Sequence, residues 1–240
     1  MNKPFAVFDI DGTLIRWQLY HAIADTMIKL GYADAAKYHG VKDARMAWKK
    51  RQGKEAFRAY EQQLVRAYES VLTSLTFEQF HTAAQAVFDE HKDQVYRYTR
   101  GLISQLKSQG YLLFAISGSQ IEIVQMIADY YGFDDCVGSL YERSKSGFTG
   151  NVTVHGKGKH VILDQLVKKH GATYKGSYAI GDSETDITML EAVTNPIAMN
   201  PTKKLFETAQ AKGWKVVIER KNVIYNLEPG DGSYILATAD

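Results

Sequence analysis

Two aspartates separated by a single residue, Asp9 and Asp11, constrain this chain more than any other feature. They follow an apolar run at residues 5–8, and Gly12 comes directly after them. An apolar run before a glycine predicts a buried strand that ends in a tight turn. Side chains two apart on a strand point to the same side, so the two carboxylates repel unless a cation or a proton separates them. We therefore expect chemistry at the carboxyl end of this strand.

Composition excludes several classes of protein. The 240 residues carry a formal net charge of +2, which gives no general attraction to nucleic acid or to an anionic membrane surface. The single cysteine, Cys136, excludes an intramolecular disulfide and a cysteine-based zinc cluster. The amino terminus has no secretory pattern, and no apolar run is long enough to span a bilayer. The expected location is cytoplasmic, with neither nucleic acid nor membrane as a partner.

Residues 16–100 differ in character from the rest of the chain. They contain no proline and are rich in residues that favour helix. Tyr60, Leu64 and Tyr68 recur at a spacing of four, which predicts an amphipathic helix, and Thr76 is expected to cap the next one. We interpret this region as a helical insertion whose aromatic stripe forms its own core.

Residues 101–240 alternate between strand and helix patterns. Strands are expected at residues 111–116, 137–140, 177–180, 196–199 and 214–218, and helices at residues 102–110, 121–131 and 161–169. A hairpin is expected at residues 141–154, and an adaptable surface segment from residue 219 onward. This alternation predicts an α/β fold with a doubly wound parallel sheet. The core domain would comprise residues 1–15 and 101–240, and the insertion after the first strand would be a cap.

Three of the expected strands end in polar loops. The second and third of these loops contain Ser117-Gly118-Ser119 and Gly181-Asp182 with Asp186. Ligands of open α/β sheets bind outside the carboxyl ends of the strands, so these loops should converge with the first one. Oxygen ligands without histidine or cysteine suit Mg²⁺. Ser117 offers a hydroxyl, and the amides of Gly118 and Ser119 are expected at a helix start, where they would bind the oxygens of a phosphate ester.

A cationic side chain is expected from Lys159, at the start of the helix near residue 161. The apolar residues Leu163 and Leu166 fix the side of that helix that packs on the core. A lysine at this point can reach a phosphoryl group and screen its charge from an attacking carboxylate.

With these residues in place, the chain resembles the haloacid dehalogenase (HAD) superfamily. Its four motifs occur in order as the block at residues 9–14, then Ser117, Lys159, and Asp182 with Asp186. Asn200-Pro201 further resembles the phosphoserine-phosphatase-like hydrolases of subfamily IB. The resemblance covers essentially the whole chain and implies a Rossmann-like core with a helical cap between the first and second motifs.

The resemblance also implies a role for each residue in a Mg²⁺-dependent phosphatase. Asp9 would be the nucleophile that forms an aspartyl-phosphate, and Asp11 the general acid and then the base. The carboxylates of Asp9 and Asp182 and the main-chain carbonyl of Asp11 would bind Mg²⁺. The remaining implied roles are phosphate binding by Ser117 and Gly118, a hydrogen bond within the first loop by Thr13, and orientation of Lys159 or of the metal's water shell by Asp186. From the residues alone, Asp186 could equally be a turn or helix-cap residue.

The substrate is expected to be a small phosphorylated metabolite. In phosphoserine phosphatases, a glutamate shortly after the first motif binds the amine of the substrate, and the matching position here is Gln18. A neutral amide cannot supply the charge that an ammonium group attracts, so phosphoserine is disfavoured. Arg66 could bind a carboxylate or could lie on a solvated helix face, and Arg16 with Trp17 indicates an anionic or aromatic substrate.

Two alternatives to a phosphatase remain at this point. A phosphotransferase would share every motif and would pass the phosphoryl group from Asp9 to an alcohol instead of water. A phosphorylatable switch of the response-regulator type is disfavoured, because such a domain is about half this length, has its phosphoacceptor on a later strand and lacks a helical cap.

Overall fold

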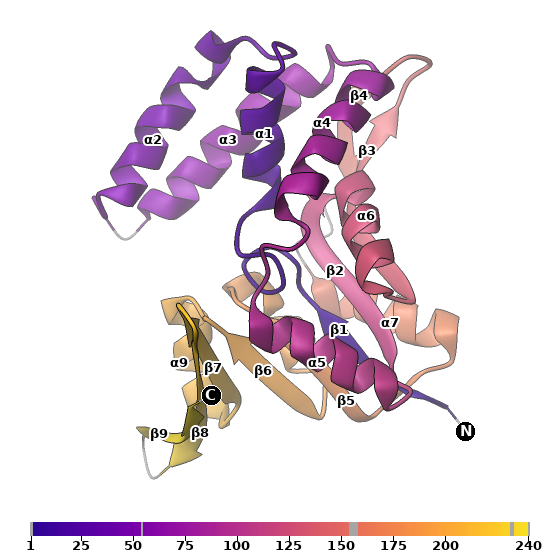
Figure 1. Cartoon of the computed structure of the whole chain (residues 1–240), viewed down its shortest axis with the longest axis vertical. Coiled ribbons are helices and arrows are strands. Elements are labelled where there is room, and N and C mark those ends of the chain that lie inside the picture. The colour runs from indigo at the N-terminus through magenta and orange to yellow at the C-terminus, as the bar shows by residue number, and fades with distance from the viewer. Residues whose placement is uncertain (1, 54, 154–157, 231–232, 240) are drawn as a thin grey trace. The chain divides into compact units, whose positions relative to one another are not determined.

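The computed structural model describes residues 2–53, 55–153, 158–230 and 233–239 (Figure 1). The chain divides into two compact units. The first comprises Met1–Trp17, His91–Ser139 and Val154–Asp240, and the second comprises Gln18–Glu90 and Leu140–Thr153. The second unit therefore contains a β-hairpin as well as the helical segment, while the cap boundaries expected from the sequence stay a prediction.

A sheet has the strand order β4-β3-β2-β1-β5-β6-β7-β8-β9, in which the strands from β2 to β9 belong to the first unit, β3 runs from the first unit into the second, and β4 belongs to the second. Its strands are β1 (Pro4–Phe8), β2 (Leu112–Gln120), β3 (Asp135–Arg143), β4 (Phe148–Thr153), β5 (Thr173–Gly181), β6 (Asn195–Met199), β7 (Lys215–Arg220), β8 (Val223–Gly230) and β9 (Ser233–Ala239). Neighbours from β3 through β7 pair in parallel, and the outer pairs at each end are antiparallel. The predicted doubly wound parallel sheet is confirmed.

Helices cover this sheet and complete the core of the first unit. They are α5 (Arg97–Ser108), α6 (Ile121–Tyr131), α7 (Lys159–His170), α8 (Ile187–Leu190) and α9 (Lys203–Lys212). One buried cluster joins Phe5, Val7 and Phe114 of the strands to residues of α7, α8 and α9. Figure 1 shows α5 in front of the sheet and α7 behind it. With helices on both faces, the central strands are apolar on both sides, as the continuous run at residues 5–8 requires.

The strand order places the polar loops together. Because β2, β1 and β5 are adjacent and parallel, the loops that follow them leave the sheet at the same edge. Asp9 follows β1, Ser117 lies near the end of β2, and Asp182 follows β5. The sheet itself therefore brings these three motifs of the sequence into one region.

The second unit is built from helices and a hairpin. Its elements are α1 (Leu19–Lys29), a 3₁₀ turn (Ala35–Tyr38), α2 (His39–Lys49), α3 (Ala56–Leu72), α4 (Phe77–His91) and the paired ends of β3 and β4. Tyr60 and Tyr68 of the predicted aromatic stripe are buried in this unit, as expected of a core. Thr76 caps α4 through its Oγ1, which accepts a hydrogen bond from the Gln79 amide at 3.2 Å. Val154, the last residue of the expected hairpin, lies outside the described residues.

The tail corrects one expectation. The described residues of β8 and β9 do not form an adaptable segment, since these two strands extend the sheet in antiparallel pairs. The polar composition misled the prediction because an edge hairpin needs few buried side chains to pair its backbone. In the described part of the chain, no helix combines the length and apolar character that crossing a bilayer requires.

Candidate active site

The first loop closes on itself directly after β1. The amides of Leu14 and Ile15 both donate to the carbonyl of Ile10, at 3.0 and 2.9 Å, and the Gly12 amide donates to the Ile15 carbonyl at 3.0 Å. Gly12 has φ of 82°, a left-handed conformation that favours glycine. Asp9 is anchored to the next strand, because its amide donates to the Ile180 carbonyl at 2.9 Å. The two acidic residues are thus held at the carboxyl edge of the sheet by the backbone.

Lys159 joins the first loop to the third. It is the first residue of α7, and its side chain is only 2% exposed. Its Nζ donates to Asp9 Oδ1 at 2.7 Å and to Asp186 Oδ1 at 2.6 Å. A buried ammonium requires such partners, because an unpaired charge in the interior is costly. The structure therefore places Lys159 between the two carboxylates.

Asp186 is fixed by the loop that follows β5. Its Oδ2 accepts hydrogen bonds from the amides of Asp182 and Ser183, both at 3.0 Å. Because Oδ1 is bound by Lys159, both carboxylate oxygens are engaged. The backbone amides thus fix the position of Asp186, and Asp186 in turn holds Lys159.

Gly181 leaves the space that Asp186 occupies. A Cβ at position 181 would lie 2.5 Å from both Cβ and Cγ of Asp186. We expect Gly181→Ala to displace Asp186, to destabilise the protein by roughly 1–3 kcal/mol and to reduce any turnover by about 10- to 100-fold. Thermal unfolding and steady-state kinetics measure the two effects. Gly101→Ala is the matched control, because a Cβ there meets nothing within 4 Å, and equal behaviour of the two variants would contradict the prediction.

Ser117 connects the second loop to the first. Its Oγ donates to Asp11 Oδ2 at 2.6 Å and accepts from the Ser119 amide at 2.9 Å. The helix start expected at Gly118 lies further along the chain, since β2 extends to Gln120 and α6 begins at Ile121. The Ser119 amide is therefore engaged locally by a serine hydroxyl, a common competitor for backbone donors. Gly118 is exposed at this edge.

The charges of the site are unbalanced. Burial is the main reason that the pKa of Asp9 rises to about 7; the nearby carboxylates of Asp186 and Asp11 raise it further, and Lys159 opposes the rise. Burial and the carboxylates of Asp9 and Asp186 raise the pKa of Asp182 well above its usual range. Burial alone would lower the pKa of Lys159, but Asp186 and Asp9 outweigh it and raise that pKa. One lysine does not neutralise these carboxylates.

The donor set fits a hard divalent cation. One carboxylate oxygen from each of Asp9, Asp182 and Asp186 lies within 4.8 Å of the others. Since both oxygens of Asp186 already accept hydrogen bonds, Asp9 and Asp182 are the side chains better placed to bind an ion. An all-oxygen set of this kind suits Mg²⁺. A bound cation would also relieve the repulsion that raises the pKa of Asp9 and Asp182.

The other predicted residues are distributed over both units. Thr13 is fully buried, and its carbonyl accepts a hydrogen bond from Thr99 Oγ1 at 2.8 Å. Its own hydroxyl has no hydrogen-bond partner among the described residues, so the expected side-chain bond within the first loop is not formed. Gln18, half-buried at the start of α1, and Arg66, exposed on α3, belong to the second unit.

The sequence interpretation missed Glu219, the last buried residue of β7 before its exposed end. This side chain forms an ion pair with Arg16, just beyond the first loop. The sequence pattern that identified Asp9 and Asp182, an acidic residue at the end of an apolar strand, also applies to Glu219. It was assigned to the tail instead.

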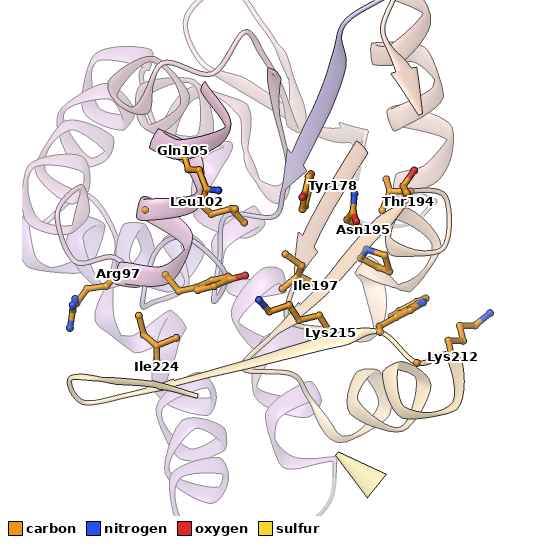
Figure 2. Close-up of a pocket in the computed structure, with 16 residues that line it drawn as sticks. Arg97, Leu102, Gln105, Tyr178, Thr194, Asn195, Ile197, Lys212, Lys215 and Ile224 are labelled. Atoms are coloured by element: carbon orange, nitrogen blue, oxygen red, sulfur yellow. The ribbon is translucent and has the colours of Figure 1, made fainter. Parts of the chain in front are cut away.

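A cavity of about 970 Å³ lies elsewhere in the first unit (Figure 2). It is bordered by α5 and by the first residues of β6 and β7, and Arg97, Lys212 and Lys215 contribute positive charge. Lys212 forms an ion pair with Glu191 at 3.0 Å, and Lys215 lies over the Tyr98 ring at 5.5 Å. Among the described residues, none of those predicted for catalysis lines this cavity, which is therefore separate from the carboxylate site.

Comparisons with known proteins place the chain in a family. A family model described as haloacid dehalogenase-like hydrolase matches residues 6–191. A histidinol-phosphatase of Neisseria meningitidis is 27% identical over 236 residues, which cover 90% of this chain and 98% of that protein. Phosphoserine phosphatase SerB1 of Mycobacterium tuberculosis is 28% identical over 136 residues, which cover 55% of this chain and 44% of that protein.

Solved structures share the fold. A Bordetella pertussis protein of unknown function aligns with a TM-score of 0.74 at 24% identity, over 91% of this chain and 99% of that one. A phospho-aspartyl intermediate analogue of phosphoserine phosphatase aligns with a TM-score of 0.64 at 22% identity, over 92% of this chain and 96% of that one. At such identities the likeness establishes the architecture of the chain.

Proposed function

Since the chain belongs to the haloacid dehalogenase-like hydrolase family, we propose that it is a Mg²⁺-dependent phosphatase that hydrolyses a small phosphomonoester through an aspartyl-phosphate on Asp9. The relatives named as phosphatases support phosphoric monoester hydrolysis. The observation that carries the proposal is the position of Lys159 Nζ, within 2.7 Å of Asp9 and 2.6 Å of Asp186. A carboxylate nucleophile beside a buried cation is what phosphoryl transfer requires.

The proposed reaction has two steps. In the first, a carboxylate oxygen of Asp9 forms a bond to phosphorus, the bond to the leaving oxygen breaks, and protonated Asp11 donates a proton to that oxygen. In the second, Asp11 takes a proton from water while the water oxygen attacks phosphorus. The bond between phosphorus and Asp9 then breaks, which restores the Asp9 carboxylate and releases inorganic phosphate.

The surrounding groups orient the reactants and neutralise charge. Lys159, held by Asp186, would screen the phosphoryl oxygens from the Asp9 carboxylate. Ser117 and the Gly118 amide would bind phosphoryl oxygens when the substrate displaces the present bond between Ser117 and Asp11. Mg²⁺ bound by Asp9, Asp182 and the Asp11 carbonyl would supply further neutralisation of phosphoryl charge.

The direct test is hydrolysis of an aryl phosphate with and without Mg²⁺. The proposal expects phosphate release that EDTA abolishes and that Mg²⁺ restores. Addition of an acceptor alcohol with a labelled phosphoryl donor distinguishes the two transfer reactions. Label recovered as inorganic phosphate supports the phosphatase, and label recovered on the alcohol would establish the phosphotransferase instead. Absence of any Mg²⁺-dependent release from a broad panel of phosphomonoesters would refute both.

Substrate choice is proposed to depend on Gln18. The family resemblance assigns this position to the amine of the substrate, where a glutamine offers no negative charge. We expect phosphoserine to have a lower kcat/KM than the best ester in a panel of phosphorylated metabolites. Gln18→Glu should raise kcat/KM for phosphoserine by about 10-fold, which corresponds to roughly 1.4 kcal/mol, relative to a phosphate ester without an amine.

The control for that experiment is Gln62→Glu, which adds the same charge at an exposed position of α3. It should leave the ratio between the two esters unchanged. The prediction is wrong if phosphoserine is already the best substrate of the wild-type protein, or if both variants change the ratio equally.

A further inference from the structure

Glu219 is a buried carboxylate outside the catalytic motifs. Its side chain is 0% exposed, although that of its partner Arg16 is 40% exposed. It accepts hydrogen bonds from the amides of Arg97 and Tyr98, at 3.1 and 3.0 Å, and from the Arg16 guanidinium. Burial of a carboxylate is costly unless donors satisfy it, and here the donors come from two distant segments of the chain.

One of those segments is the start of α5. Its N-cap residue, Tyr96, makes no side-chain capping bond. The amides of the first helical turn have no acceptor within the helix. The carboxylate of Glu219, 122 residues after Arg97, accepts their hydrogen bonds instead. A negative charge at a helix amino terminus also interacts favourably with the helix dipole. The orientation of α5 at this end therefore depends on Glu219.

The other segment is the exit of the first loop, which is bonded to the same start of α5. The Arg16 amide donates to the Gln94 carbonyl at 2.9 Å, and the Tyr96 amide donates to the Leu14 carbonyl at 3.0 Å. The Arg16 guanidinium lies over the Tyr96 ring at 5.1 Å. The loop that carries Asp9 and Asp11 therefore ends at Arg16, which is bonded to Glu219.

The backbone of Glu219 reaches the Asp182 loop as well. Its amide donates to Asn200 Oδ1 at 2.9 Å, and the Asn200 amide donates to the Val217 carbonyl at 2.8 Å. Two residues further on, the Thr202 amide donates to the Asp182 carbonyl at 2.8 Å. Hydrogen bonds therefore connect Glu219 both to the loop of Asp9 and Asp11 and to the loop of Asp182.

We propose that Glu219 is a positioning residue for the carboxylate site, and that Arg16 is its tether to the first loop. The expected effect on kcat rests on the proposed phosphatase function. Because Glu219 neutralises Arg16, the guanidinium acts as an anchor.

The kinetic test compares Glu219→Gln, Arg16→Gln and the double variant with Glu228→Gln. The amide oxygen introduced by Glu219→Gln can still accept one of the two backbone hydrogen bonds, so the fold should persist. Glu228 is an exposed carboxylate on the neighbouring strand β8. With an aryl phosphate, each single variant should lower kcat by about 10-fold with less than about a threefold change in KM, since misplacement of the loop affects attack more than binding. The double variant should match the single ones, because the tether is cut only once.

Conservative replacement gives a further kinetic check. Arg16→Lys keeps a cation opposite Glu219 and should retain most of the wild-type kcat. Losses that multiply in the double variant, or a kcat for Glu219→Gln equal to that of Glu228→Gln, would overturn the proposal.

Hydrogen exchange tests the tether independently of activity. In Glu219→Gln, amides in residues 10–17 and 94–99 should exchange at least about tenfold faster than in the wild type, while those of α7 should be unchanged. Unchanged exchange in both segments would overturn the tether even if kcat falls. A wild-type protein with no phosphatase activity would refute the proposed function alone, and the exchange rates would still decide the role of Glu219.

Discussion

Asp9→Asn is expected to abolish turnover of every phosphomonoester, with a loss in kcat of roughly 10⁴-fold or more. A neutral amide cannot attack phosphorus, yet it has the shape of the carboxylate and can still accept a hydrogen bond from Lys159. The fold should therefore be retained. Steady-state assays with an aryl phosphate and Mg²⁺ measure the loss.

The same substitution should change how stability depends on pH in the metal-free protein. The pKa of Asp9 is raised to about 7 from 3.8, mainly by burial, so the folded state holds this proton more tightly than the unfolded state. The stability of the wild type should therefore fall as pH rises through this window, and that contribution should be absent in the variant. Denaturant unfolding from about pH 5 to pH 8 measures the difference.

Asp43→Asn is the control, because Asp43 is an exposed carboxylate on α2. It should leave both kcat and the pH dependence of stability unchanged. Mg²⁺-dependent turnover by pure Asp9→Asn above about 1% of the wild-type rate would contradict the assignment of the nucleophile, since an inactive nucleophile position costs far more than that.

Lys159→Met is expected to cost the metal-free protein about 3–5 kcal/mol at alkaline pH. The substitution leaves the carboxylates of Asp9 and Asp186 buried without the cation that lies 2.7 and 2.6 Å from them. The cost should shrink as pH falls toward about 7, because Lys159 lowers the pKa of Asp9, so the variant takes up this proton at a higher pH than the wild type does. Mg²⁺ should restore part of the stability, while kcat should stay at least about 10²-fold below the wild type.

Lys168→Met serves as the control on the same helix, because Lys168 lies on the exposed side of α7. It should change stability by less than about 0.5 kcal/mol. A Lys159→Met protein as stable as this control in the absence of metal would show that the carboxylates near position 159 are not ionised, and would remove the basis for the proposed charge balance.

Local patterns carried the prediction of the architecture. The continuous apolar run at residues 5–8 predicted a buried strand, and β1 lies inside the sheet between β2 and β5, with residues 5–8 buried. The spacing of Tyr60, Leu64 and Tyr68 predicted the buried side of α3. These predictions succeed because strand and helix periodicity are properties of adjacent residues, which tertiary contacts then reinforce. The β8–β9 extension was missed because edge strands carry a weak hydrophobic pattern.

By itself the sequence determined the parallel sheet and the edge at which the acidic loops gather, since alternating strands and helices place the carboxyl ends of parallel strands at the same edge. Only the tertiary structure decided which side chains meet there. Lys159 contacts Asp9 across 150 positions of the chain, and Arg16 contacts Glu219 across 203. The physical reason is that such pairs depend on the relative register of distant elements, and each buried charge is stable only where a partner from another segment satisfies it.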